Sequence, residues 1–127
     1  MTQTISRSLI AAAIASPDRF AGDSDEDLWR QPQAVLEFMG VEPGMHVLDA
    51  FSAGGYYTEL LARIVGPEGE VIAYNNPPYA RFAEKGIAAR YAGGRLPNVQ
   101  QVTSTFEALE LEPASLDAAI FVMSYHD

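Results

Sequence analysis

From residue 45 onward, short apolar runs alternate with segments of helical periodicity. Glycine or proline follows each helical segment, as at Gly66-Pro67 and Gly93-Gly94. Strands that alternate with helices form parallel sheets with right-handed crossovers and helices on their faces. We therefore predict an α/β fold built on a parallel sheet. The predicted strands span residues 45–51, 70–74, 99–103 and 116–124, and the predicted helices between them span residues 57–65 and 79–91.

The first forty residues are predicted to form helices that precede the sheet. An apolar run of alanine and isoleucine over residues 9–15 ends near Pro17, and a second helix runs from Pro32 to Met39. A secretory signal is the alternative for the first run, but a single arginine precedes it and the cleavage neighbourhood is poor. We predict a helical cap over residues 1–40, a sheet core over residues 41–127 and a cytoplasmic location.

Composition limits which classes of partner and which kinds of chemical site the chain can have. A chain of 127 residues can form one domain with a buried core. Its net charge of −9 at pH 7 provides no basic face for a phosphate backbone, so we expect no nucleic acid partner. No run reaches the ~18 apolar residues of a membrane span, so we expect no membrane partner. The chain has no cysteine, which excludes thiolate metal sites and a cysteine nucleophile.

Four acidic residues lie close together after the first helix. One interpretation is a metal site, but the glycine turn and the later bidentate glutamate of a calcium loop are missing. We favour a solvated helix start with Ser24 as its N-cap, because negative charge stabilises a helix N-terminus. No metal is therefore predicted. The acidic residues are Asp23, Asp25, Glu26 and Asp27.

A cofactor loop is predicted between the first strand and the helix that follows it. The strand ends in Asp49, and the small residues Ser52-Ala53-Gly54-Gly55 come after it. Glycine lets the backbone approach a ligand, and a helix start offers unpaired N–H donors. Ligands of parallel sheets bind beyond the carboxyl ends of the strands. At those ends the sequence places Asp49 to Gly55, Asn75, Ser104-Thr105 and Ser124 to Asp127.

The acid at the end of the first strand bears on the kind of cofactor. A nicotinamide dinucleotide usually needs Gly-x-Gly-x-x-Gly at this place, and the chain lacks that pattern. A carboxylate suits a positively charged ligand instead. Val47-Leu48-Asp49 with its glycine loop, and Val65-Gly-Pro-Glu-Gly-Glu-Val71, resemble the class I S-adenosylmethionine-dependent methyltransferases. Trp29-Arg-Gln-Pro32 and the terminal Tyr-His-Asp are similar to a bacterial subgroup of predicted methyltransferases, and the resemblance covers residues 28–127.

This resemblance implies a Rossmann-like sheet and S-adenosylmethionine as the cofactor. Phe51 and Ala53 stand where the family's loop has its first two glycines, and Gly55 keeps its place. The family's ribose-binding acid corresponds to Asn75, and its adenine-binding acid is replaced by Ser104 or Thr105. The implied cofactor-binding residues are Asp49, Phe51, Ser52, Ala53, Gly54, Gly55, Asn75, Ser104 and Thr105.

The resemblance also implies methyl transfer, which we expect to act on an unknown, small-molecule acceptor. Acceptors in this family sit at the end of the fourth strand, where His126 lies between Tyr125 and Asp127. Imidazole titrates near neutral pH, so His126 is the candidate catalytic base. The alternative is that these residues form a frayed terminus or a structural turn. The alternative function is a non-catalytic binding or assembly module that has lost the cofactor, which Phe51 and Asn75 favour.

The number of strands is the largest departure from the family. The family's sheet has seven strands in the spatial order 3-2-1-4-5-7-6, whereas four are predicted here. The fourth would form an apolar edge, which soluble proteins avoid. Three explanations stay open, namely a truncated domain of a longer enzyme, pairing of that edge with another copy, and a rearranged sheet. If the chain ends at Asp127, we expect a homo-oligomer through this edge.

Overall fold

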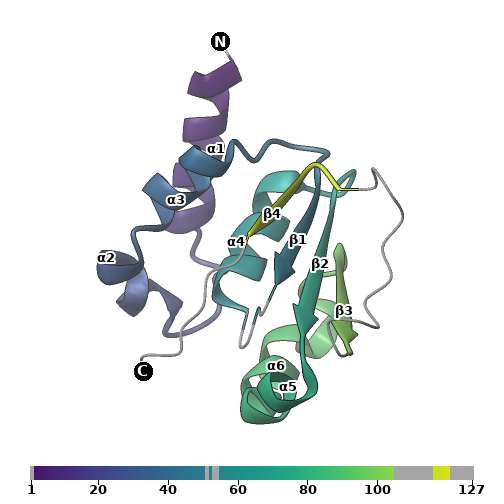
Figure 1. Cartoon of the computed structure of the whole chain (residues 1–127). Coiled ribbons are helices and arrows are strands. Elements are labelled where there is room, and N and C mark those ends of the chain that lie inside the picture. The colour runs from purple at the N-terminus through teal and green to yellow at the C-terminus, as the bar shows by residue number, and fades with distance from the viewer. Residues whose placement is uncertain (1, 51, 53–54, 105–115, 121–127) are drawn as a thin grey trace.

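Four parallel strands form one sheet in the described part of the chain. The computed structural model of the chain describes residues 2–50, 52, 55–104 and 116–120. In space the strands follow the order β3-β2-β1-β4, so that β1 is an interior strand and the strand order reverses beside it (Figure 1). The predicted parallel α/β sheet is confirmed. The strands are β1 (His46–Ala50), β2 (Glu70–Asn75), β3 (Val99–Thr103) and β4 (Ala118–Ile120).

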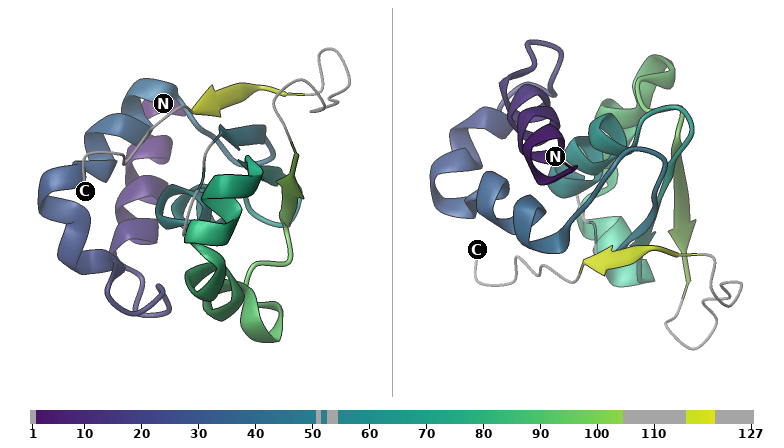
Figure 2. Two further views of the ribbon diagram at one scale, coloured as in Figure 1. Left: turned by 60° about the horizontal axis from the view of Figure 1, so that its bottom comes forward. Right: turned by 90° about the horizontal axis from the view of Figure 1, so that it is seen from above.

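Helices form the rest of the described structure. Figures 1 and 2 show the N-terminal helices grouped on one side of the molecule, with α4 between them and the strands. The predicted helices at residues 32–39 and 57–65 are confirmed, and the N-terminal helix also forms. None of the described helices is long and apolar enough to cross a membrane. They are α1 (Thr2–Ala15), the 3-10 turn η1 (Asp23–Glu26), α2 (Asp27–Arg30), α3 (Pro32–Met39), α4 (Tyr56–Val65), α5 (Pro77–Phe82), α6 (Glu84–Tyr91) and the 3-10 turn η2 (Ala92–Gly94).

The central helix α4 holds the main hydrophobic core together. Nine of its ten residues are buried, because it contacts β1 and β2 as well as α1. Ile10 of α1 and Leu36 of α3 therefore join Val47 and Val71 of the sheet in one cluster around α4. The N-terminal helices share this core with the sheet, and the boundary at residue 40 stays a prediction. A smaller second cluster consists of Leu48, Ala50 and Tyr74.

The helix predicted over residues 79–91 is divided in two. α5 starts at Pro77, and α6 starts after Ala83, whose φ of −98° and ψ of 8° lie outside the helical region. Proline fits the first turn of a helix, where its missing N–H leaves no bond unmade. Pro77 and Pro78 therefore lie in the first turn of α5.

A matched pair of substitutions on α3 tests this core. Leu36 has no exposed surface, whereas Phe38 is 93% exposed. Leu36→Ala should lower the free energy of unfolding by about 2–5 kcal/mol, because it removes buried apolar surface and leaves a cavity. Phe38→Ala should change it by less than about 0.5 kcal/mol. Urea unfolding followed by circular dichroism measures both, and equal losses would contradict the packing of α3.

Candidate functional site

The carboxyl ends of β1, β2 and β3 meet at one edge of the sheet. The strand register places Asp49 of β1 beside Ala73 of β2, and Asn75 of β2 beside Thr103 of β3. Adjacent strands in parallel register point equivalent side chains to the same face. The edge at which ligands bind to parallel sheets therefore carries an acid, an amide and a hydroxyl from three strands.

Hydrogen bonds join the loop after β1 to the ends of β2 and β3. The Ser52 amide donates to the Tyr74 carbonyl at 2.9 Å, and the Asn75 side-chain amide donates to the Ser52 hydroxyl at 3.1 Å. The Ser104 amide donates to the Asn75 carbonyl at 3.3 Å. Three predicted cofactor residues, Ser52, Asn75 and Ser104, are therefore brought together from separate parts of the chain.

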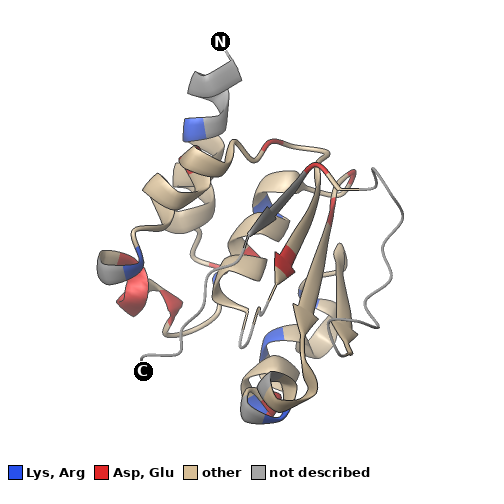
Figure 3. Cartoon of the chain, viewed as in Figure 1, with Lys and Arg blue, Asp and Glu red and all other residues tan. Residues whose placement is uncertain are grey.

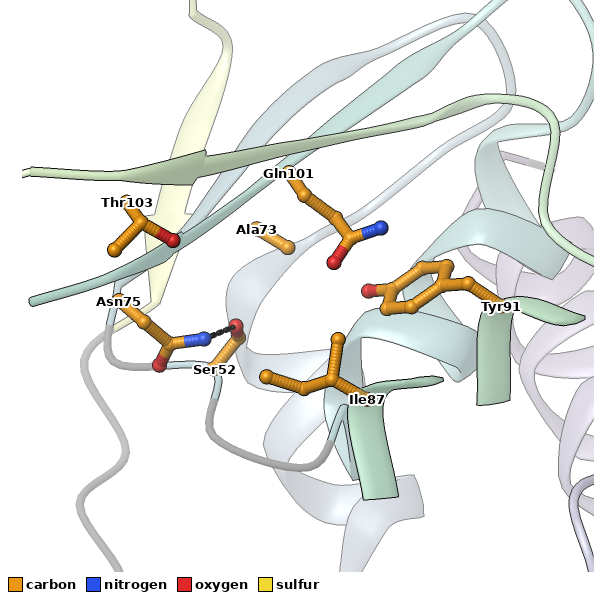
Figure 4. A pocket seen from close by; sticks show the side chains of 7 residues that line it. All are labelled: Ser52, Ala73, Asn75, Ile87, Tyr91, Gln101 and Thr103. Atoms are coloured by element: carbon orange, nitrogen blue, oxygen red, sulfur yellow. Dashed lines mark hydrogen bonds between the residues drawn. The ribbon is translucent and has the colours of Figure 1, made fainter. Parts of the chain in front are cut away.

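A pocket lies beside this junction (Figure 4). Figure 4 shows the Gln101 amide and the Tyr91 hydroxyl directed toward the same space as Ile87, with the Asn75–Ser52 hydrogen bond at its other end. The pocket is small, because its cavity volume of about 10 Å³ is about that needed for one water molecule, whereas complete small-molecule sites have roughly 300–1,000 Å³. The described residues therefore form only part of the wall of such a site. Its lining residues are Ser52, Ala73, Asn75, Ile87, Tyr91, Gln101 and Thr103.

The Ser104 side chain is a buried polar group at the end of β3. The Tyr74 hydroxyl donates to the Ser104 carbonyl at 2.8 Å, which anchors the chain as it leaves the strand. The Ser104 hydroxyl itself has no hydrogen-bond partner among the described residues. A buried hydroxyl without a partner costs about 1–3 kcal/mol. The described residues therefore supply no partner for this hydroxyl group.

Asp49 is a buried acid that accepts a hydrogen bond from a hydroxyl group. It is 3% exposed, and the Thr58 hydroxyl of α4 donates to its Oδ2 atom at 2.6 Å. Burial raises the pKa of Asp49 from 3.8 to about 7, although the bond from Thr58 lowers it. The carboxyl group therefore lies between its neutral and charged forms near neutral pH.

Gly55 precedes α4 as its N-cap and has no room for a side chain. Its φ of 95° lies in the left-handed region, and a Cβ atom would lie 2.6 Å from Cδ of Arg90. The Gly55 amide donates to the Ser52 carbonyl at 2.9 Å. Gly55, which keeps its place in the predicted loop, is thus required by the packing of Arg90.

An ion cluster lies behind the glycine loop and joins three parts of the chain. Arg90 of α6 donates to Asp23 of η1 at 2.6 and 2.8 Å, and to Glu59 of α4 at 2.9 Å. Arg95 and Arg63 each donate to Oε2 of Glu59 at 3.1 Å. Burial raises the pKa of Glu59, but the hydrogen bonds from Arg95 and Arg63 outweigh it and hold that pKa below its usual value. We call Asp23, Glu59, Arg63, Arg90 and Arg95 the Glu59 cluster.

The interpretation of the acidic stretch as a solvated helix start is wrong. Asp23 is 5% exposed within the Glu59 cluster, and Asp27 accepts two bonds from Arg19 at 2.8 and 2.9 Å. Gly22 rather than Ser24 is the N-cap of η1, and no side chain caps that turn. Figure 3 shows acidic and basic segments side by side along η1 and α2. In the described part of the chain, no group of three or more histidine, cysteine or acidic residues is placed to hold a metal ion.

Several predicted site residues lie outside the described residues, and several lining residues were not predicted. Residues of the first kind are Phe51, Ala53, Gly54, Thr105 and His126. The lining residues that were not predicted are Ala73, Ile87, Tyr91, Gln101 and Thr103. The spacing of Gln101 and Thr103 on a strand, and of Ile87 and Tyr91 on a helix, indicates a shared face for each pair. Nothing in the sequence indicates that these two faces meet.

A methyltransferase family model matches the part of the chain that carries this site. The model, for protein-L-isoaspartate(D-aspartate) O-methyltransferase, matches residues 31–88. This range includes β1, the described residues of the glycine loop, and β2 with Asn75.

Two curated relatives and one solved structure are similar to the chain. The tRNA (adenine(58)-N(1))-methyltransferase TrmI of Thermus thermophilus is 33% identical over 89 residues, which are 69% of this chain and 34% of that protein. A protein-L-isoaspartate O-methyltransferase of Triticum aestivum is 45% identical over 56 residues, 44% of this chain and 24% of that protein. The chain thus spans about a third or less of these relatives. A SAM dependent methyltransferase from Aquifex aeolicus shares the fold, with a TM-score of 0.59, 24% identity, and coverage of 89% of this chain and 54% of that one.

The expectation that the chain has no nucleic acid partner is wrong as a conclusion from net charge. A relative at 33% identity is by its name a tRNA methyltransferase, although this chain carries a charge of −9. Net charge is a sum over all residues, whereas recognition of a phosphate backbone depends on where basic side chains lie. In that relative, moreover, about two thirds of the length lies outside the match.

A pair of Asp→Asn substitutions tests the burial of the Glu59 cluster. Asp23→Asn should lower the free energy of unfolding by about 3 kcal/mol, because it leaves the Arg90 guanidinium buried without its full counter-charge. Asp25 is exposed two residues further on, so Asp25→Asn should change it by less than about 0.5 kcal/mol. Urea unfolding at pH 7 measures both. Similar effects of the two substitutions would contradict the buried ion pair.

The raised pKa of Asp49 predicts how stability depends on pH. The folded chain keeps the Asp49 proton up to about pH 7 and the unfolded chain only to about pH 3.8, so the free energy of unfolding falls as pH rises between these values. Asp49→Asn has no such proton. Relative to this variant, the free energy of unfolding of the unchanged protein should fall by up to about 4 kcal/mol between about pH 4 and pH 8, since one pKa unit is about 1.4 kcal/mol. Urea unfolding at a series of pH values tests this, and a constant difference would contradict it.

Proposed function

We propose that this chain, which belongs to the class I S-adenosylmethionine-dependent methyltransferase family, binds S-adenosylmethionine at the carboxyl edge of its sheet and takes part in methyl transfer. The observation that carries the proposal is the convergence of Asp49, Ser52, Asn75 and Ser104 beside one pocket. These four polar groups come from the ends of three strands, in the order of elements that a nucleoside-binding edge needs.

The chemistry of the described residues fits this cofactor. Five of the seven lining residues carry a polar group and none carries a charge, which suits a nucleoside with hydroxyl and amino groups. The unpartnered Ser104 hydroxyl at the end of β3 offers one more polar contact. The buried carboxyl group of Asp49 suits a ligand with positive charge. An arginine approaches the loop, but Asp23 and Glu59 neutralise it.

We assign the residues as follows. Asn75 and Ser52, which are already hydrogen-bonded to each other, would hold the ribose hydroxyls. The amide of Asn75 replaces the acid that the family resemblance implies, and an amide binds a hydroxyl through single neutral bonds. Gln101 of the pocket lining would bind a polar edge of the base, and Ile87 would provide an apolar contact for its face. Ser104, which follows β3 outside the lining, stays a predicted cofactor residue.

The chain's contribution to catalysis would be binding, orientation and exclusion of water. When bound, S-adenosylmethionine supplies an electrophilic methyl group on a positively charged sulfur. Such a displacement is accelerated by holding the two reacting groups in line in a dry site. Gly55, fixed by Arg90, would set the backbone of the loop against the cofactor. His126, the candidate base from the sequence, stays a prediction.

Which molecule accepts the methyl group depends on the whole protein. The small-molecule acceptor expected from the sequence stays a prediction. The names of the relatives point to larger acceptors, since one relative is a tRNA methyltransferase and the other a protein-L-isoaspartate O-methyltransferase. A panel of radiolabelled methyl-transfer assays with tRNA, an isoaspartyl peptide and a small-molecule mixture distinguishes the three classes.

Binding of S-adenosylhomocysteine, the demethylated product, tests the site directly. Gln101 lines the pocket, whereas Gln100 is the preceding residue of the same strand and faces the other way. Gln101→Ala should weaken binding about 5- to 10-fold, the effect of one lost hydrogen bond of about 1–1.4 kcal/mol, and Gln100→Ala should leave it unchanged. Isothermal titration calorimetry measures both.

The same titration separates the enzyme from the alternative of a non-catalytic module. A folded chain that gives no heat with millimolar S-adenosylhomocysteine has no cofactor site and supports the module. Equal weakening by Gln100→Ala and Gln101→Ala would place the ligand elsewhere. Circular dichroism of each variant provides the control for folding.

A further inference from the structure

We propose that Asp27 is a positioning residue for the cofactor loop, because it holds Tyr56 at the end of that loop and thereby sets where Ser52 lies in the pocket wall. The inference rests on the proposed function and extends it to the N-terminal segment, residues 19–30. Asp27 belongs to α2 and is not among the described residues that line the pocket. It would therefore act on the ligand through other residues rather than by contact.

The Tyr56 side chain is held by residues of the N-terminal segment. Tyr56 is the first residue of α4 and is 6% exposed. Its hydroxyl group donates a hydrogen bond to Oδ1 of Asp27, which lies 29 residues earlier in the chain. The guanidinium carbon of Arg30 lies 4.6 Å from the centroid of the Tyr56 ring. The first turn of α4 is thus attached to the segment at both the hydroxyl group and the ring of one tyrosine.

Asp27 is itself fixed in place by an ion pair. Arg19 donates to its Oδ1 and Oδ2 atoms at 2.9 and 2.8 Å, the two-bond arrangement that gives an arginine–carboxylate pair a defined geometry. Arg19 also donates to the Ile14 carbonyl in the last turn of α1 at 2.8 Å, and its side chain is 5% exposed. Asp27 therefore offers the Tyr56 hydroxyl an acceptor at a fixed position.

A short chain of bonds connects Tyr56 to the pocket. The amide of Gly55, the residue before Tyr56, donates to the Ser52 carbonyl at 2.9 Å. Ser52 lines the pocket, and its hydroxyl accepts a hydrogen bond from the Asn75 side chain at 3.1 Å (Figure 4). Every link joins two described residues. A shift of Tyr56 is therefore passed to the pair of side chains that we assign to the ribose hydroxyls.

Arg90 limits how this turn can adjust to a change at Tyr56. A Cβ atom on Gly55 would lie 2.6 Å from Cδ of Arg90, and Asp23 and Glu59 bind the Arg90 guanidinium group at 2.6 and 2.9 Å. The N-terminal segment thus holds the end of the loop twice, through Arg90 and through Tyr56. Tyr56 is the better position for a test, because loss of its hydroxyl group leaves both arginine–aspartate ion pairs in place.

The position of the loop bears on affinity. A loop that already has its bound conformation loses less conformational freedom when the ligand binds, so its affinity is higher. Loss of the Asp27–Tyr56 bond should therefore raise the Kd of the site. A purely structural role predicts otherwise, because a variant that unfolds more easily, but is fully folded in the assay, binds with an unchanged Kd.

Isothermal titration calorimetry of the 127-residue chain with S-adenosylhomocysteine tests this, where circular dichroism shows each variant to be folded. Tyr56→Phe should raise the Kd about 3- to 10-fold, the range expected for one lost hydrogen bond. Asn98→Ala is the control for stability, because Asn98 donates to the Ala62 and Gly66 carbonyls at 2.9 Å, at the other end of α4. It should lower the urea midpoint and leave the Kd unchanged.

A double-mutant cycle tests whether Asp27 acts through Tyr56. Asp27→Ala should raise the Kd by at least as much as Tyr56→Phe, and the two changes together by no more than Asp27→Ala alone, because both break the same link. Asp25→Ala removes an exposed acid of the same segment and should have no effect. Effects that multiply would mean that the two residues act independently, which overturns the inference. If Asp27→Ala does not fold, the comparison of Tyr56→Phe with Asn98→Ala decides.

Failure of this inference is distinguishable from failure of the proposed function. If the unchanged chain binds S-adenosylhomocysteine and Tyr56→Phe binds it equally well, the inference is wrong and the proposed function stands. The same holds if Tyr56→Phe and Asn98→Ala weaken binding alike, since the effect then reflects stability. If the folded, unchanged chain does not bind the ligand, the proposed function fails and this inference fails with it.

Discussion

The carboxylate of Glu59 is buried inside the main core, and arginines from three places in the chain surround it. A buried charge without partners costs several kcal/mol, so the chain is stable only when Arg63, Arg90 and Arg95 converge on this group. The same Arg90 binds Asp23 and leaves space only for a glycine at position 55. Electrostatic pairing around one glutamate thus sets where the N-terminal segment, α4 and α6 lie, and with them the loop that faces the pocket.

The two buried acids of the site have opposite environments. Glu59 is surrounded by guanidinium groups and stays charged, whereas Asp49 has a hydroxyl donor and a raised pKa. The two residues are ten positions apart in sequence, on β1 and α4. One acid is therefore held in its charged form by its partners, whereas burial raises the pKa of the other. Pairs of acids that their surroundings push apart in pKa are typical of functional sites.

Local patterns account for most of the fold, and contacts between distant segments account for what they miss. Pro32–Met39 and Val99–Thr103 have the predicted bounds, because helix and strand periodicity and their proline and glycine boundaries are local properties. Ser52 and Asn75 could be assigned to one edge because the ends of parallel strands meet there. The burial of Asp23 and the pairing of Tyr91 with Gln101 in one pocket could not be predicted. Each depends on a partner from another element, and Arg90 lies 67 residues from Asp23.

The position of α1 in the core has a consequence during synthesis. Ile10 is fully buried in the cluster around α4, and its contacts in that helix are made about 50 residues later in the chain. At roughly 5–20 residues per second, the ribosome delivers those partners about 3–10 seconds after α1 has been made. The apolar face of α1 is without its native cover for that time. The nascent chain is therefore most exposed to chaperones and to misassociation before α4 emerges.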